Sequence, residues 1–163
     1  IRPDKNKIIV NQENDLFDWM TVQQNMEIAT HDPKIICKFL KIALLDKKID
    51  EYPGQLSGGM KKRLSLVRAL AAKPDLLVLD EPFSYLDYST KTDLLKQFQE
   101  IIKATKTTTI LITHNIDESI YLSNRVVVLK GHPVRIVNDI KIENDKLAKK
   151  YKYNLIKKIK KAY

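Results

Sequence analysis

The sequence contains a single cysteine and no long apolar run. One cysteine cannot form an internal disulfide or a cysteine-based metal site, and its scarcity fits a reducing compartment. The longest apolar runs, such as 76–79 and 126–129, are strand-sized and far short of the roughly 18 residues of a membrane span. No signal-peptide pattern is visible. Cys37 falls within an apolar helical pattern, so we expect it to be buried and structural.

Glycine is also scarce, with four in 163 residues. A nucleotide-binding loop of the form G-x-x-x-x-G-K-[ST] needs two glycines and a lysine that reaches the phosphates. Gly54 and Gly59 have this spacing, but Met60 stands where the lysine is required. The 163 residues therefore lack such a phosphate loop.

The formal net charge of +9 comes largely from lysines in the last twenty residues. Such an excess can indicate a nucleic-acid or anionic membrane partner. The positive charges are spread over helix faces, however, and no aromatic platform for stacking bases is interleaved with them. We favour an ordinary lysine-rich surface and expect no nucleic-acid partner. The hydrophobic fraction of 44% is enough for one domain with one core.

Strand and helix patterns alternate along the chain, which predicts an α/β fold. The continuous apolar run 76–79 is typical of a strand buried on both faces of a parallel sheet. Thr21 and Pro33 stand where an N-cap and a first-turn proline belong. The predicted strands are 8–10, 76–79, 107–113 and 125–129, and the predicted helices are 21–29, 33–45, 60–72, 89–104 and 116–122.

Two adjacent carboxylates, Asp80 and Glu81, directly follow the apolar run 76–79. Ligands of parallel α/β sheets gather at the carboxyl ends of the strands. A carboxylate there can hold Mg²⁺ directly or through water, and its neighbour can accept a proton from an attacking water. The alternative is that both acids merely cap the next helix.

A serine and two glycines, Ser57, Gly58 and Gly59, precede the predicted helix 60–72. Glycines allow backbone amides to approach a phosphate, and a helix N-terminus favours an anion. The alternative is a simple N-cap with a glycine-rich turn. His114 follows the predicted strand 107–113 and could donate a hydrogen bond to a phosphate oxygen, although a lone histidine is more often structural.

These blocks together resemble the ATPase family of ABC transporters, in order and at similar spacing over residues 8–137. Residues 56–60 (LSGGM) resemble its signature motif, 76–82 (LLVLDEP) its Walker B strand, 84–87 (SYLD) its D-loop and 113–114 its H-loop. Gln12 resembles the Q-loop glutamine. The resemblance implies a mostly parallel P-loop NTPase-like (RecA-like) core with a small helical subdomain.

The resemblance also implies roles for individual residues. Glu81 would be the general base, Asp80 the carboxylate associated with Mg²⁺, and His114 a contact to the γ-phosphate of ATP. Gln12 would sense Mg²⁺ and the attacking water.

Other residues would act across a head-to-tail dimer. Ser57, Gly58 and Gly59 would contact ATP held by the opposite subunit, and Asp87 would lie at the dimer interface.

The resemblance implies three regions within this sequence and a further region that the sequence lacks. We expect a helical subdomain at about 13–73, an α/β core at about 74–140 and a basic C-terminal helix at 141–163. In the family, the Walker A loop precedes the Q-loop, so it would lie upstream of Ile1 together with its strand and helix. We therefore expect the 163 residues to be a truncated copy of, or an excerpt from, a longer protein.

Three segments, 16–22, 116–119 and 129–137, are similar to importers of the nitrate, sulfonate and taurine group. Asp18 and Asn115 depart from that group, where proline and aspartate are usual. Trp19 either contacts a membrane subunit or is a plain core aromatic. The implied partners are a second ATPase subunit, transmembrane permease subunits and, indirectly, an extracytoplasmic solute-binding protein. The implied location is peripheral, on the cytoplasmic face of the plasma membrane.

Two other functions compete with ATP-driven import. One is an ABC ATPase acting outside transport, but only 43 residues separate Gln12 from Leu56, whereas repair-type relatives carry a long coiled coil there. The other is a remnant without turnover that only binds partners, and the missing Walker A loop keeps that possibility open.

Overall fold

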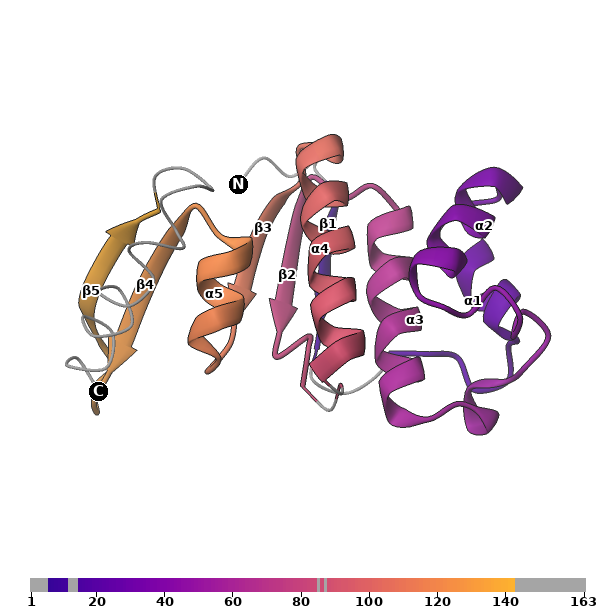
Figure 1. Ribbon diagram of the computed structural model, residues 1–163, viewed down its shortest axis with the longest axis horizontal. Coiled ribbons are helices and arrows are strands. Elements are labelled where there is room, and N and C mark those ends of the chain that lie inside the picture. Colours follow the sequence, from indigo (N-terminus) through magenta and orange to yellow (C-terminus); the bar gives the residue numbers. More distant parts are fainter. Residues whose placement is uncertain (1–5, 12–14, 85, 87, 143–163) are drawn as a thin grey trace. The chain divides into compact units, whose positions relative to one another are not determined.

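The computed structural model describes residues 6–11, 15–84, 86 and 88–142, in two compact units, Ile1–Ile112 and Thr113–Tyr163. Gln12, Asp87 and nearly all of the predicted C-terminal helix lie outside the described residues. The first unit contains β1 (Lys7–Val10), α1 (Val22–Glu27), α2 (Pro33–Ile42), the 3₁₀ helix η1 (Pro53–Gln55), α3 (Gly58–Ala71), β2 (Leu76–Asp80), α4 (Tyr88–Thr105) and β3 (Thr108–Ile112) (Figure 1). The second contains α5 (Ile116–Leu122), β4 (Arg125–Lys130) and β5 (Arg135–Lys141).

The first unit is built on a parallel sheet with the order β1-β2-β3 (Figure 1). β2 is central, and Val78 pairs with Ile9 on one side and Ile110 on the other. Because all three strands are parallel, their carboxyl ends meet at one edge of the sheet. The α/β fold predicted from the sequence is confirmed.

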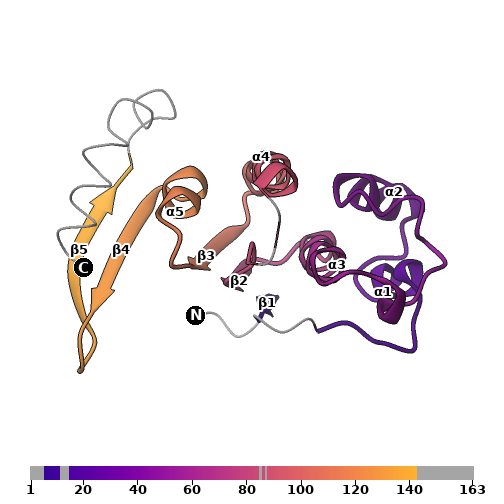
Figure 2. The same cartoon turned by 60° about the horizontal axis from the view of Figure 1, so that its bottom comes forward.

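The two faces of this sheet are buried to different extents. Leu77 and Leu79 of β2 are fully buried. Figure 2 shows α4 over one face of the sheet. On the other face, Ile9, Ile110 and Ile112 are 59%, 50% and 51% exposed. The prediction that 76–79 is buried on both faces is therefore wrong for the described chain, because alternate residues of β2 face opposite sides and only one side is covered.

α1 and α2 begin where the sequence predicts. The Thr21 side chain accepts from the amide of Gln24, whose own side chain accepts from the amide of Thr21, forming a capping box. α2 is capped by Asp32. It ends at Ile42, earlier than predicted, because Leu44 adopts a left-handed conformation with φ 56° that no helix can continue through.

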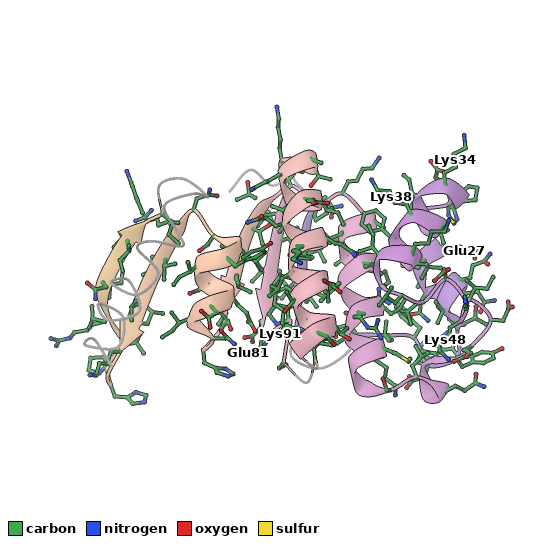
Figure 3. The ribbon with its side chains drawn as sticks, in the orientation of Figure 1. Glu27, Lys34, Lys38, Lys48, Glu81 and Lys91 are labelled. Carbon is green, nitrogen blue, oxygen red and sulfur yellow. The ribbon has the colours of Figure 1, made fainter. Side chains whose placement is uncertain are left out.

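α2 buries the predicted apolar positions but not its cysteine. Ile36, Phe39 and Leu40 are buried. Cys37 is exposed, so the prediction of a buried cysteine is wrong. Cys37 lies on the helix face opposite the apolar stripe, together with lysines such as Lys34 and Lys38, which Figure 3 labels.

α3 is buried on nearly all sides and packs against α1, α2 and β1. It begins at Gly58, two residues earlier than predicted, so both signature glycines lie in its first turn. The apolar residues Leu64, Val67 and Leu70 are buried, and so are the charged residues Lys62 and Arg63. The Arg63 guanidinium donates to the carbonyl of Ala43, the C-cap residue of α2, at a distance of 2.7 Å.

The second unit contains a helix and an antiparallel hairpin, β4–β5. Val126 and Val128 form its core with Ile116, Ile140 and Ile142. The turn contains Gly131 at φ 88°, a conformation that favours glycine. The alternation pattern did not predict β5. Among the described residues, no helix is long and apolar enough to cross a membrane.

Candidate functional site

The predicted carboxylate pair lies at the carboxyl edge of the parallel sheet. Asp80 is the last residue of β2 and pairs with Ile112, on the open face of the sheet. Glu81 follows where the chain leaves the sheet, and Figure 3 labels it there. Both are half-buried. The structure therefore places this pair where parallel α/β sheets bind ligands.

The backbone of Glu81 is held in an unusual conformation. Its φ is 47°, which is uncommon for a residue other than glycine. Its amide donates 2.9 Å to the carbonyl of Ile112, and its own carbonyl accepts from the amide and hydroxyl of Ser84 at 3.3 and 2.8 Å. Three hydrogen bonds thus fix a strained residue, and strain of this kind clusters at functional sites.

An aromatic contact anchors the turn that follows Glu81. Phe83 is fully buried and packs edge-on against Phe98 of α4, with the ring centroids 5.6 Å apart. Phe98 is itself 1% exposed. Such an aromatic pair adds about 0.5–1.5 kcal/mol beyond its area burial. The sheet on one side and α4 on the other therefore determine where Glu81 lies.

The acidic residues fit a Mg²⁺ site completed by a ligand. In the described ranges, no group of three or more histidine, cysteine or acidic side chains could enclose a metal ion. Mg²⁺ is commonly held by only one or two carboxylates together with substrate phosphates and water. Asp80 and Glu81 offer those carboxylates, and a phosphate-bearing ligand would have to offer the rest.

The signature residues form the N-terminus of α3. The Ser57 hydroxyl oxygen accepts from the amide of Met60 at 3.3 Å, so Ser57 is the N-cap of the helix. A Cβ added at Gly58 would meet no atom within 4 Å. The described fold therefore does not itself require glycine at 58. The structure shows the capping role of Ser57, and the contact to nucleotide stays a prediction.

Lys62 of α3 connects the signature helix to the edge of the sheet. Its side chain is 3% exposed, and its ammonium donates 2.7 Å to the carbonyl of Asn11. Burial lowers its pKa from 10.5, while the charges of Asp15, Asp80 and Glu81 act in the opposite direction. The Lys62 charge is thus close enough to the carboxylate pair to interact with it.

Arg68, further along α3, holds the segment after residue 14. It donates to the carbonyl of Asp15 and to Oδ1 of Asn25 at 3.2 Å. Its guanidinium lies 5.4 Å from the ring centroid of Phe17, close enough for a cation–π contact. Burial lowers the pKa of Arg68, and the negative charge of Asp15 opposes part of that shift.

Phe17 in turn supports Trp19, with ring centroids 5.3 Å apart in an edge-to-face pair. Trp19 is 71% exposed, so the interpretation of Trp19 as a core aromatic is wrong.

His114 belongs to the second unit and precedes α5. Its neighbour Asn115 caps α5 by accepting from the amides of Asp117 and Glu118. Asparagine is as good an N-cap as aspartate, which accounts for this departure from the family pattern. The Thr113 hydroxyl donates 2.9 Å to the buried Glu118. The grouping of His114 with the carboxylate pair stays a prediction.

Sequence reasoning missed Lys62, Arg68 and Ser84. A helical period identifies one apolar face of α3, but it does not reveal that neighbouring elements also cover the opposite side. Ser84 stands in the D-loop block, yet its bond to the carbonyl of Glu81 depends on a backbone conformation that residue type does not predict.

A parallel sheet with paired carboxylates at its carboxyl edge, beside a helix that begins with Ser-Gly-Gly, fits a nucleotide hydrolase of the P-loop NTPase fold. A dimeric bacterial ABC transporter cassette, MJ0796, has a matching fold with a TM-score of 0.73, 26% identity, and coverage of 85% of this chain and 64% of that one. The ABC transporter family matches residues 2–84, and the chain belongs to this family.

Two kinds of curated relatives illustrate the similarity. The aliphatic sulfonates import ATP-binding protein SsuB of Bacillus subtilis (strain 168) is 42% identical over 130 residues, which cover 77% of this chain and 51% of the relative. The bicarbonate transport ATP-binding protein CmpC of Synechocystis sp. is 36% identical over 142 residues, 81% of this chain and 21% of the relative. The chain thus spans about half the length of SsuB, and its predicted resemblance to the sulfonate importer group is confirmed.

Proposed function

We propose that this chain is part of the ATP-hydrolysing subunit of an ABC importer. The observation that carries the proposal is the backbone of Glu81, fixed by three hydrogen bonds beside Asp80 at the ligand-binding edge of the sheet. The names of the similar SsuB and CmpC proteins support import, and sulfonate-like or other small anionic solutes are the substrate class that they suggest.

In this proposal Glu81 is the general base. Its carboxylate accepts a proton from the water that attacks the γ-phosphate, a role that typically contributes 10²–10⁴-fold to a rate. Asp80 would hold Mg²⁺ directly or through water. The bound ion would supply charge stabilisation for the phosphate oxygens. By resemblance, His114 contacts the γ-phosphate and Gln12 senses Mg²⁺ and the attacking water.

The N-terminus of α3 would bind the nucleotide of a second subunit. The open space at Gly58 leaves room for a phosphate to approach the backbone. The amides of the first helical turn have no acceptors within the helix and favour an anion. Ser57 adds a hydroxyl, and Asp87 would lie at the same dimer interface. The dimeric state of the MJ0796 cassette supports this arrangement.

Trp19 is the proposed contact to a membrane subunit. It is largely exposed, yet Phe17 holds it in place, and the Arg68 guanidinium in turn holds Phe17. A large exposed aromatic on a rigid support is typical of a protein interface. This contact would place the subunit peripherally on the cytoplasmic face of the membrane.

The phosphate loop would come from a segment that these 163 residues do not contain. Ile9, Ile110 and Ile112 leave an apolar face of the sheet open on the side that also carries Asp80. The curated SsuB relatives are about twice as long as the region they share with this chain. We propose that a strand and helix bearing a Walker A loop cover this open face.

The test uses a restored subunit, meaning this chain preceded by a family segment with a Walker A loop. It should bind Mg-ATP and hydrolyse it. Glu81→Gln should still bind ATP but lose turnover about 10²–10⁴-fold, because the amide keeps the size of the side chain and cannot accept the proton. Steady-state hydrolysis near wild type in Glu81→Gln would rule out Glu81 as the base.

A restored subunit that binds ATP but does not turn it over would favour the competing interpretation, a remnant that only binds partners.

A further inference from the structure

We propose that Lys62 and Arg68 are positioning residues: from the signature helix, they hold the backbone on both sides of residues 12–14. Lys62 donates to the carbonyl of Asn11, and Arg68 donates to the carbonyl of Asp15. Both donors belong to α3, and their acceptors are 51 and 53 residues away in sequence. The consequence for turnover rests on the function proposed above.

The Lys62 contact is a specific one. A lysine is almost never fully buried unless its ammonium is paired. Lys62 is 3% exposed, and its bond to Asn11 is 2.7 Å long, the range of charge-assisted hydrogen bonds. A residue that only filled space on α3 would not need a charge. The cost of burying this ammonium therefore points to a role in fixing Asn11.

The Arg68 contact is broader. One guanidinium reaches the backbone of Asp15, the side chain of Asn25 and the ring of Phe17. Asn25 is fully buried and bonds the same segment again, through the amide and carbonyl of Phe17. Arginine suits this site because its planar, multi-donor group can serve several partners at once.

The two contacts join separate parts of the proposed machinery. α3 begins at the signature residues, Asn11 directly follows β1, and the Lys62 charge interacts with Asp80 and Glu81. Any shift of α3 must therefore be transmitted to the backbone at both 11 and 15. In this way nucleotide contact at the start of α3 would be coupled to the backbone of Asn11 and Asp15 in the same subunit.

The first test is hydrogen–deuterium exchange of the 163-residue chain. Lys62→Met should speed exchange in peptides covering 8–16 by about ten- to a hundredfold, the weight of one hydrogen bond from a charged donor. Lys62→Arg should stay near wild type, because it keeps the charge and the donor. Lys62→Gln keeps a hydrogen-bond donor without the charge, so its exchange rate at 8–16 separates the contribution of the donor from that of the charge. Lys41→Met, an exposed lysine on α2, is the matched control and should change nothing at 8–16.

Arg68→Lys tests the second contact. It keeps the charge but loses the planar fork, so exchange should rise at 15–19 and not at 8–11.

The second test is steady-state kinetics of the restored subunit. Lys62→Met should lower kcat about tenfold while the Kd for Mg-ATP stays within about twofold, because misplacement of a positioned group affects the rate rather than nucleotide binding. Lys62→Arg should restore most of the rate.

Each outcome decides a different point. Equal rises in exchange across 8–16 and α3 would mean general loosening and would overturn the positioning role. A local rise with unchanged kcat would also overturn it. If the wild-type restored subunit fails to hydrolyse ATP, the proposed function fails, while the exchange data still decide whether Lys62 and Arg68 hold the backbone.

Discussion

Replacing Glu81 with glycine should make the protein more stable than replacing it with alanine. Glu81 has φ 47°, in the left-handed region that costs an L-residue roughly 1–2 kcal/mol. Glycine does not carry that cost, although it loses about 0.4–1 kcal/mol through its greater freedom in the unfolded chain. The balance favours Glu81→Gly over Glu81→Ala by roughly 0.5–1 kcal/mol.

Asp80 provides a matched control one residue earlier. It is part of β2 and has no positive φ, so glycine there should be less stable than alanine by about 0.5–1 kcal/mol. The same pair of substitutions should thus have opposite signs at adjacent positions. Neither comparison depends on the carboxylate, because both members of each pair lack it.

Urea and thermal unfolding of the four variants measure these differences directly. For a chain of this size, 1 kcal/mol corresponds to a shift of about 2–4 °C in the thermal midpoint. In the restored subunit, both Glu81 variants should lose hydrolysis, although Glu81→Gly should be the more stable of the two. The reasoning is refuted if glycine and alanine rank in the same order at 80 and 81.

Three further predictions concern the core, the signature loop and the hairpin. Leu77→Ala should cost about 3–4 kcal/mol of unfolding free energy and Val78→Ala roughly 1 kcal/mol, because only Leu77 is fully buried; similar urea midpoints would contradict this. Gly58→Asp should fold normally and, in the restored subunit, bind ATP but fail to dimerise on it, because a carboxylate would face a triphosphate; lost ATP affinity by titration calorimetry would show that the loop acts in cis. The hydrogen bond from Arg125 lowers the pKa of Asp139, so this pair should stabilise the hairpin above pH 3.8 and lose that contribution as the pH falls through the lower folded pKa; an unshifted NMR titration of Asp139 would contradict it.

The sequence predicted the elements whose signals are local. Apolar runs located β1, β2 and β3, and Thr21 marked the start of α1 because its capping box is formed by residues three apart. The carboxylate pair was found for a similar reason. A polar pair directly after a buried strand must emerge at the edge of the sheet, and Asp80 and Glu81 do so.

The features that were missed depend on neighbours or on backbone conformation. α2 ends early because of the φ of Leu44, and Cys37 is exposed because the apolar stripe passes beside it. β5 is mostly polar and exposed, and its position is set by pairing with β4 around a bulge at Val128. The burial of Lys62 likewise requires the other elements around α3, which a helical period does not describe.

The most direct test of the central claim is isothermal titration of Mg-ATP into the 163-residue chain and into the restored subunit. The chain carries the proposed Walker B carboxylates, Asp80 and Glu81, but no G-x-x-x-x-G-K-[ST] loop. We predict no micromolar binding by the 163 residues alone, and micromolar binding followed by hydrolysis once the Walker A segment is present. Micromolar binding by the 163-residue chain itself would contradict the account.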